Sequence, residues 1–216
     1  MKKDRKIYDE QRLLHTDFYI RRLHSILGIL PIGIFLCFHL LINGSAILGV
    51  DAWSAVINGM KSVPFIIVAE IGIIALPIIF HTVYGFYIVY LSDMPLLRYT
   101  YLKNWMFILQ RVTAIITTIF VLYHVIFVRI MQHETMDIMK AMADVLQTPL
   151  GFVLQTIGIW AAIYHFTNGI FTFLLTWGVL HGERIQKVAS ICTMLFCAAM
   201  CLWSLIILIR IAMMPI

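Results

Sequence analysis

The sequence predicts an all-α membrane protein whose five transmembrane helices form an up-and-down bundle. Of its 216 residues, 62% are hydrophobic and only 12% are charged, whereas a soluble domain carries about 25% charged residues. The apolar residues gather in five long runs separated by short connections. Short connections make consecutive helices antiparallel neighbours. Most of the molecular surface is therefore expected to face lipid.

Each of the five runs can cross a bilayer, which takes about 20 apolar residues. They span residues 23–50, 63–91, 104–128, 148–182 and 188–209. Within them, the charged residues are Glu70 in the second run and Arg111 in the third. The longest connection, between the third and fourth runs, is predicted to hold a short surface helix. Residues 1–18 form an N-terminal arm, and residues 19–216 form one membrane domain.

Lysine and arginine collect on one side of the predicted bundle, which sets its orientation. That side comprises the arm and the connections after the second and fourth runs. Its eleven basic residues are Lys2, Lys3, Arg5, Lys6, Arg12, Arg21, Arg22, Arg98, Lys103, Arg184 and Lys187. The four on the opposite side are Lys61, Arg129, Lys140 and Arg210. The positive-inside rule therefore predicts a cytoplasmic N-terminus and an outer C-terminus.

The cysteines exclude two kinds of metal or cofactor site. Cys37, Cys192, Cys197 and Cys201 all lie in apolar runs, and no CxxC motif occurs. Neither a zinc knuckle nor a covalent CxxCH haem attachment is available. Their positions are typical of small buried apolar residues.

Of the eight histidines, His15 and His24 lie in or next to the N-terminal arm, and His133 and His181 are loop or helix-end residues. The other four lie well inside the apolar runs, one in each of the first four. They are His39, His81, His124 and His165, at spacings of 42, 43 and 41 residues. An ionisable side chain inside a bilayer is costly and marks a functional site by default. One such histidine could simply bond to a neighbouring helix, but four on successive helices indicate a shared role.

The depths of these histidines predict how they pair. At a rise of about 1.5 Å per residue, His39 and His124 lie about 25 and 30 Å from the inner ends of their helices. His81 and His165 lie only about 15 and 18 Å from the inner ends of theirs. The first and third helices therefore supply an outer pair, and the second and fourth supply an inner pair.

Two imidazoles at each of two depths favour haem over zinc. A zinc site needs four ligands at one level, commonly with carboxylate or thiolate help, and none lies nearby. Axial ligation of two b haems fits better, with the porphyrin supplying the other four nitrogens. Small residues on the histidine faces would leave room for a flat ring, although they also serve plain helix packing. They are Gly28, Pro77, Gly85, Thr113, Thr117, Gly158 and Gly169.

At these residues the chain resembles a known family, the cytochrome b subunit of Bacillus-type succinate:menaquinone reductases and fumarate reductases. The resemblance runs from about Tyr19 to the end of the fifth helix. The segments that carry it are YIRRLHSILGILPIGIF, CFHLLIN, IIFHTVYG, NWMFILQRVTAIIT and HFTNGIFTFLLTWG.

The resemblance implies a dihaem membrane anchor in the bacterial cytoplasmic membrane. It implies that His81 and His165 bind the inner haem iron and that His39 and His124 bind the outer one. His24 matches a family histidine that is not a ligand. A flavoprotein subunit and an iron–sulfur subunit would dock on the cytoplasmic face. The partners would include membrane lipid but no nucleic acid, and electrons would pass to or from menaquinone. Dicarboxylate chemistry would then reside in the partner subunits.

Two charged residues inside the runs are further candidates. Glu70 precedes His81 by 11 residues, so on a regular helix it shares that face, about 16 Å further outward. It is predicted to face the bundle level with the outer haem and to relay protons to the quinone. Arg111 lies about 10 Å into the third helix, where it could pair with a haem propionate. Interfacial placement is the alternative for both.

Two other functions remain open from the residues. The chain could be the cytochrome b of another quinone oxidoreductase, although bc-type subunits place two histidines on each of two helices. It could also be a histidine-relay proton channel or transporter, which needs no haem. The presence or absence of b-type absorption bands distinguishes the haem-free class.

Overall fold

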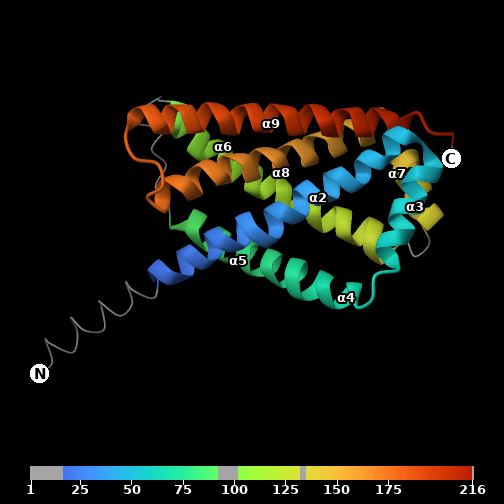
Figure 1. Ribbon diagram of the computed structural model, residues 1–216, viewed down its shortest axis with the longest axis horizontal. Coiled ribbons are helices and arrows are strands. Elements are labelled where there is room, and N and C mark those ends of the chain that lie inside the picture. Colours follow the sequence, from blue (N-terminus) through green and yellow to red (C-terminus); the bar gives the residue numbers. More distant parts are fainter. Residues whose placement is uncertain (1–16, 92–101, 132–134, 216) are drawn as a thin grey trace, which may run out of the picture.

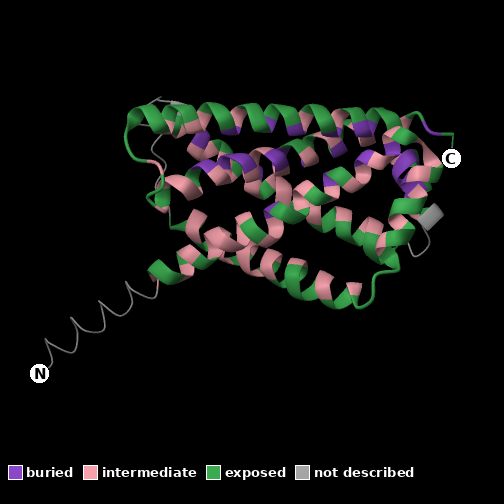
Figure 2. Ribbon diagram, viewed as in Figure 1, coloured by how far each residue is buried: buried purple, intermediate pink, exposed green. Residues whose placement is uncertain are grey.

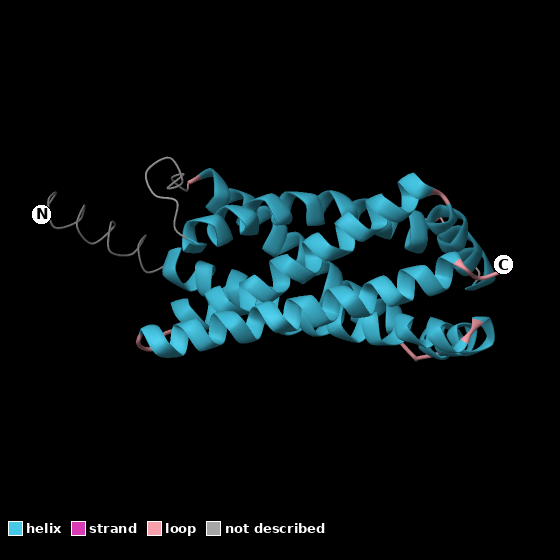
Figure 3. Ribbon diagram, turned by 90° about the horizontal axis from the view of Figure 1, so that it is seen from above, coloured by secondary structure: helices cyan, strands magenta, loops and turns pink. Residues whose placement is uncertain are grey.

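The computed structural model describes residues 17–91, 102–131 and 135–215, and this part of the chain is helical without strands (Figure 3). Five helical segments are long and apolar enough to cross a membrane. They are Asp17–Leu48, Ile66–Tyr90, Lys103–Ile130, Pro149–Thr176 and Glu183–Ala212. The predicted five-helix membrane fold is confirmed, with ends that differ from the apolar runs by a few residues.

The spans comprise both regular and irregular helix. The first contains the π-helical segment η1 (Gly28–Gly33), α2 (Ile34–Asn43) and the 3₁₀ segment η2 (Gly44–Leu48). The second contains α4 (Ile66–Ala69), the π-helical η3 (Glu70–Ala75) and α5 (Leu76–Tyr90). The third contains α6 (Leu102–His124) and the π-helical η5 (Val125–Ile130). The fourth and fifth are α8 (Pro149–Thr176) and α9 (Glu183–Ala212).

Helix α8 is the centre of the bundle. It packs along both α6 and α9 and also meets η1 of the first span (Figure 1). Burial is concentrated on α8 and on the face of α9 that meets it, whereas α4 and α5 contain no buried residue (Figure 2). Exposed Leu, Ile, Val and Phe side chains cover the outside of the spans, as expected of a surface that faces lipid.

Two shorter helices pack together at the end of the bundle where the chain ends, α3 (Val50–Lys61) and α7 (Thr135–Gln147) (Figure 1). Trp53 of α3 and Met139 of α7 are almost fully buried in one apolar cluster with the last turns of α9. The predicted surface helix between the third and fourth spans is confirmed as α7. The sequence reading missed α3, because a short amphipathic helix buries one face only and lacks a long apolar run.

The π-helical segments change the phase of three spans. Pro31 lies inside η1, and Pro77 follows η3 by two residues; proline removes a backbone donor and disturbs the regular ladder. Segment η5 contains no proline. A rotation of about 100° per residue therefore does not hold across such a segment, and η3 lies between Glu70 and His81.

Several sequence predictions concern residues outside the described part of the chain. These are the arm up to residue 16, Arg98 and the first part of the longest connection. The domain boundary at residue 18 and the cytoplasmic N-terminus therefore stay predictions.

Candidate cofactor sites

The structure brings the four span histidines together as two pairs. The rings of His39 in α2 and His124 at the end of α6 have centroids 5.9 Å apart, with an interplanar angle of 83°. The rings of His81 in α5 and His165 in α8 have centroids 6.1 Å apart, at 84°. These are the pairs that the depth argument predicts. Their role as iron ligands stays a prediction.

Hydrogen bonds set the tautomer of the inner pair. His81 Nδ1 lies 2.9 Å from the His24 carbonyl oxygen, and His165 Nδ1 lies 3.1 Å from the Gln110 carbonyl oxygen. Because a carbonyl only accepts, each Nδ1 must carry the proton. Each Nε2 then keeps its lone pair, which is the form of histidine that binds a metal.

A polar clamp between α6 and α8 holds His165 in place. Gln110 Nε2 donates to the His165 carbonyl at 3.0 Å, so Gln110 and His165 bond to each other twice. Asn168, 1% exposed, donates to Gln110 Oε1 at 2.8 Å. Sequence reasoning overlooked this clamp. The signal was available, because a glutamine and an asparagine inside apolar runs need partners.

The outer pair is bonded differently. Asn43 Nδ2 donates to His39 Nε2 at 3.3 Å and to the His39 carbonyl at 2.9 Å, so the Nε2 lone pair of His39 accepts a hydrogen bond. His124 Nδ1 is buried and has no hydrogen-bond partner in the described part of the chain. Phe120 stacks on His124 and Phe35 stacks on His39, with centroids 5.6 and 5.3 Å apart.

The ring separations suit a metal held between two imidazoles. A bond of about 2 Å from metal to each ring nitrogen places the two centroids about 6 Å apart, close to the observed 5.9 and 6.1 Å. Within the described residues, no group of three or more His, Cys, Asp or Glu could hold a metal ion. Each pair therefore fits a cofactor that supplies its other ligands itself, as a porphyrin does.

His24 is part of the inner site, although the sequence reading placed it in or next to the arm. It lies within the first span, and its ring stacks on His81 with centroids 4.1 Å apart and planes within 5°. Gly28 makes room for His81, because a Cβ there would lie 2.5 Å from His81 Cε1. A Cβ added at Gly85 would likewise lie 3.3 Å from His24 Nε2. These small residues therefore admit imidazole rings.

Glu70 lies at the bundle surface, not in its interior. Its Oε2 accepts from Arg129 Nη2 at 2.8 Å and from Arg129 Nε at 3.1 Å. The two side chains are 38% and 54% exposed, respectively. The prediction that Glu70 faces the bundle on the side of His81 is wrong, because η3 separates the two residues and shifts the helical phase. Its proton-relay role is untested.

Arg111 lies beside Gln110, and therefore at the level of the inner pair. Its guanidinium packs 3.3 Å from the Phe107 ring centroid and donates to the Phe107 carbonyl at 3.1 Å. The predicted contact with a haem propionate stays a prediction.

Comparison with known proteins identifies the family. Residues 93–206, more than half of the chain, match the model of the succinate dehydrogenase/fumarate reductase transmembrane subunit. The chain belongs to this family. A Bacillus subtilis (strain 168) relative, the succinate dehydrogenase cytochrome b558 subunit, is 42% identical over 187 residues, covering 86% of this chain and 93% of the relative. No solved structure matches the chain.

The family and the five apolar spans fit a multi-pass bacterial membrane protein. Membership of the succinate dehydrogenase/fumarate reductase transmembrane subunit family confirms the resemblance that the sequence predicted. The relative's name states that it is a cytochrome b.

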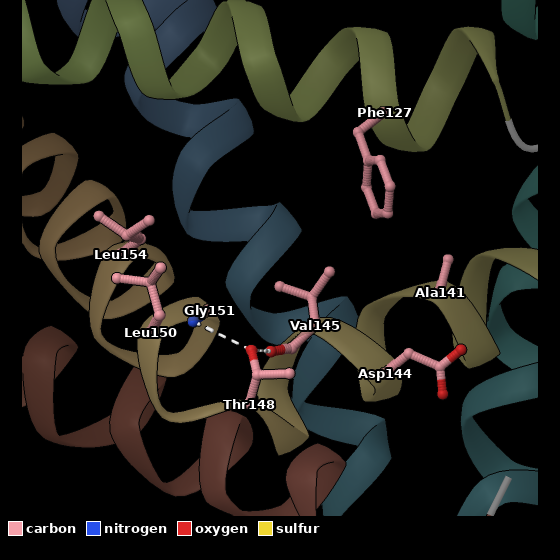
Figure 4. A pocket seen from close by; sticks show the side chains of 8 residues that line it. All are labelled: Phe127, Ala141, Asp144, Val145, Thr148, Leu150, Gly151 and Leu154. Carbon is pink, nitrogen blue, oxygen red and sulfur yellow. Dashed lines mark hydrogen bonds between the residues drawn. The ribbon is translucent and has the colours of Figure 1, made fainter.

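This transmembrane subunit also carries a shallow apolar pocket at the end of the bundle near α7 (Figure 4). Phe127, Leu150 and Leu154 are among its lining side chains, and Asp144 is the charged residue of the lining. Thr148 caps the start of α8 there by accepting from the Gly151 amide at 3.1 Å. None of the predicted site residues lines this pocket.

Proposed function

We propose that this chain carries electrons between an iron–sulfur subunit and menaquinone through two b haems, one at each histidine pair. The observation that supports this most is the pairing itself. Four helices contribute one histidine each, and the rings meet in two pairs, 5.9 and 6.1 Å apart. Two such centres at different depths would form a path along the bundle.

The residues present fit a haem at each pair. His81 and His165 each have an Nε2 lone pair available to a metal, as the hydrogen bonds above require. A metal at His39 Nε2 would replace the hydrogen bond that this atom accepts from Asn43. When bound, haem iron supplies one-electron transfer. The chain's own groups orient the imidazoles of the inner pair, through the His24 and Gln110 carbonyls.

Family membership supports the proposed partners. A transmembrane subunit of a succinate dehydrogenase or fumarate reductase would anchor a flavoprotein and an iron–sulfur subunit, which perform the dicarboxylate chemistry. Basic residues of the described part at the predicted cytoplasmic end, such as Arg21, Arg22 and Lys103, suit that docking face. The name of the Bacillus subtilis relative supports b-type haem.

The outer half of the bundle is the proposed site of quinone chemistry. Reduction of a quinone consumes protons, and a carboxylate near the quinone can deliver them. Glu70 has one carboxylate oxygen, Oε2, held by both Arg129 donors. We assign the proton relay to Glu70 and the orientation of its carboxylate to Arg129.

Four single alanine variants of the assembled complex test the pairing. Reduced-minus-oxidised spectra with redox titration would show two b-type centres in the parent protein. We expect His39→Ala and His124→Ala to lose the same centre and His81→Ala and His165→Ala to lose the other. Each change removes one axial ligand and leaves the second pair intact.

Two results would contradict the proposal. Crossed pairs or four equal phenotypes would refute the pairing, and the absence of b-type bands in the parent complex would refute haem binding altogether. The latter result would favour a histidine relay for protons. His181→Ala, at an exposed position outside the spans, is the matched control and should keep both centres.

A further inference from the structure

Gln155 on α8 is a buried amide without visible partners. It is 2% exposed, and neither its amide nitrogen nor its amide oxygen has a hydrogen-bond partner among the residues described. An unsatisfied buried polar group costs about 1–3 kcal/mol. If this position only packed one helix against another, leucine would be the more stable residue. The amide therefore indicates a polar group nearby with which it can form a hydrogen bond.

The packing of α6 on α8 places Gln155 at the level of the outer histidine pair. Gly158, one turn from Gln155, lies directly against the Phe120 ring of α6. Phe120 in turn stacks on His124, one turn further along α6, at 5.6 Å between centroids. Because the two helices are antiparallel, one turn outward from this contact reaches Gln155 on α8 and His124 on α6.

His124 needs the acceptor that Gln155 offers. A metal-binding histidine almost always donates its second ring N–H to an acceptor, which orients the ring and raises its basicity. His81 and His165 have backbone carbonyls for this purpose. His124 Nδ1 is buried and has no partner within the described ranges.

Helices α6 and α8 each carry one histidine and one glutamine, and the two helices run in opposite directions. Gln110 of α6 accepts from His165 of α8 through its carbonyl, and its side chain holds the His165 backbone. Gln155 of α8 lies at the level of His124 of α6, as the contact of Gly158 with Phe120 indicates. Each histidine of this helix pair thus has a glutamine of the other helix at its own level.

We propose that Gln155 is a positioning residue for His124, with Gln155 Oε1 accepting from His124 Nδ1–H directly or through one buried water. Water suits a buried site that offers several polar partners. The bond would keep the lone pair of His124 on Nε2, toward the iron. The inference rests on the proposed haem function and adds a residue to the outer site.

The variant Gln155→Leu, in the assembled complex, tests this assignment by redox titration of each haem. Without its acceptor, the His124 ring becomes a weaker donor to iron, which disfavours the ferric state. We expect the ferrous-to-ferric ratio of the outer haem to rise by up to about tenfold at a fixed potential, which is about 59 mV for one electron. The inner haem should keep its potential.

A conservative variant and a control variant accompany Gln155→Leu. Gln155→Asn keeps an amide within reach of a bridging water and should return the outer potential part of the way. Gln147→Leu is the matched control, because Gln147 lies on α7 and donates to the Met214 carbonyl at 3.3 Å. It should leave both potentials unchanged. Selective loss of the outer haem in Gln155→Leu would also support the assignment.

An unchanged outer potential in Gln155→Leu, together with a higher melting temperature, would overturn the inference. That result would show that Gln155 has no role at the haem and that its unpaired amide only destabilises the protein. Loss of both haems would overturn it as well, since the role would then be structural. Failure of the parent complex to bind haem is a separate result that would refute the proposed function itself.

Discussion

At the residue scale, the polar side chains inside the spans mark the candidate sites. No water in a bilayer core satisfies a stray donor or acceptor, so such groups pair with protein or serve a ligand. Gln110 and Asn168 bond across α6 and α8. Gln155 and the Nδ1 atom of His124 have no partner in the described chain, and they lie at the other histidine pair. At the inner pair each histidine Nδ1 has a backbone acceptor, whereas at the outer pair His124 Nδ1 has none among the described residues.

Glu70→Gln tests the assigned proton relay at this scale. The amide keeps the size of the side chain but cannot carry the proton. We expect menaquinone-linked turnover to fall by about 10²-fold, near the lower bound for a lost acid–base group, while both haems remain bound. Turnover with quinone and with an artificial acceptor, measured beside haem spectra, would separate the two effects.

Asp51→Asn is the control for Glu70→Gln. Asp51 is an exposed acid in the first turn of α3, at the same end of the bundle. This variant should retain full quinone turnover. Loss of haem or of assembly in Glu70→Gln would argue for a structural role of the Glu70–Arg129 ion pair instead.

At the element scale, glycines opposite aromatic and imidazole rings set how closely the helices approach. Gly28 lies against His81, Gly33 against Phe166, Gly44 against Trp203 and Gly158 against Phe120. Small residues of this kind are the usual means of close packing between membrane helices. In this bundle Gly28 and Gly158 also determine where the rings of His81 and Phe120, near the candidate cofactor sites, can lie.

Gly28→Ala should disturb the inner site selectively. The added Cβ would lie 2.5 Å from His81 Cε1, so the imidazole must move, at an overpacking cost of about 1–3 kcal/mol. We expect weaker retention of the inner haem and normal retention of the outer one, measured by haem content after detergent extraction. Gly72→Ala, with nothing within 4 Å of the added Cβ, should retain both. Equal behaviour of the two variants would contradict this packing argument.

At the scale of the whole molecule, the bundle has two different ends. One end is closed by α3 and α7, packed on the last turns of α9. At the other end Asp17 accepts from Arg21 at 2.7 Å and from Tyr84 at 2.8 Å, and Arg22 stacks over Trp177 at 4.3 Å. The charge distribution of the sequence predicts that this second end faces the cytoplasm.

Single cysteines at Lys61 and Lys187 test that orientation, with the four native cysteines replaced by alanine. Lys61 ends α3 and Lys187 lies in the first turns of α9, and both are exposed. A membrane-impermeant thiol reagent added to intact cells should label Lys61→Cys, whereas Lys187→Cys should react only after permeabilisation. The reverse pattern would invert the bundle and place the outer histidine pair on the cytoplasmic side.

The sequence by itself determined the number of spans, the surface helix α7 and the family, because long apolar runs and motif segments are local features. Histidine pairing also followed from depth, since the rise per residue is nearly constant along a helix. The angle of a side chain around the helix axis is less predictable than its depth, because each irregular residue adds an error to that angle. The six π-helical residues of η3 were therefore enough to turn Glu70 to the surface, where it meets Arg129.

Contacts between helices were decided by the tertiary structure alone. The stacking of His24 on His81, the two hydrogen bonds between Gln110 and His165, and the common level of Gln155 and His124 all depend on the register of one helix against another. That register results from side-chain packing at the interface. Hydropathy reports only that a helix is buried in lipid, and carries no information on which turn of one helix meets which turn of its neighbour.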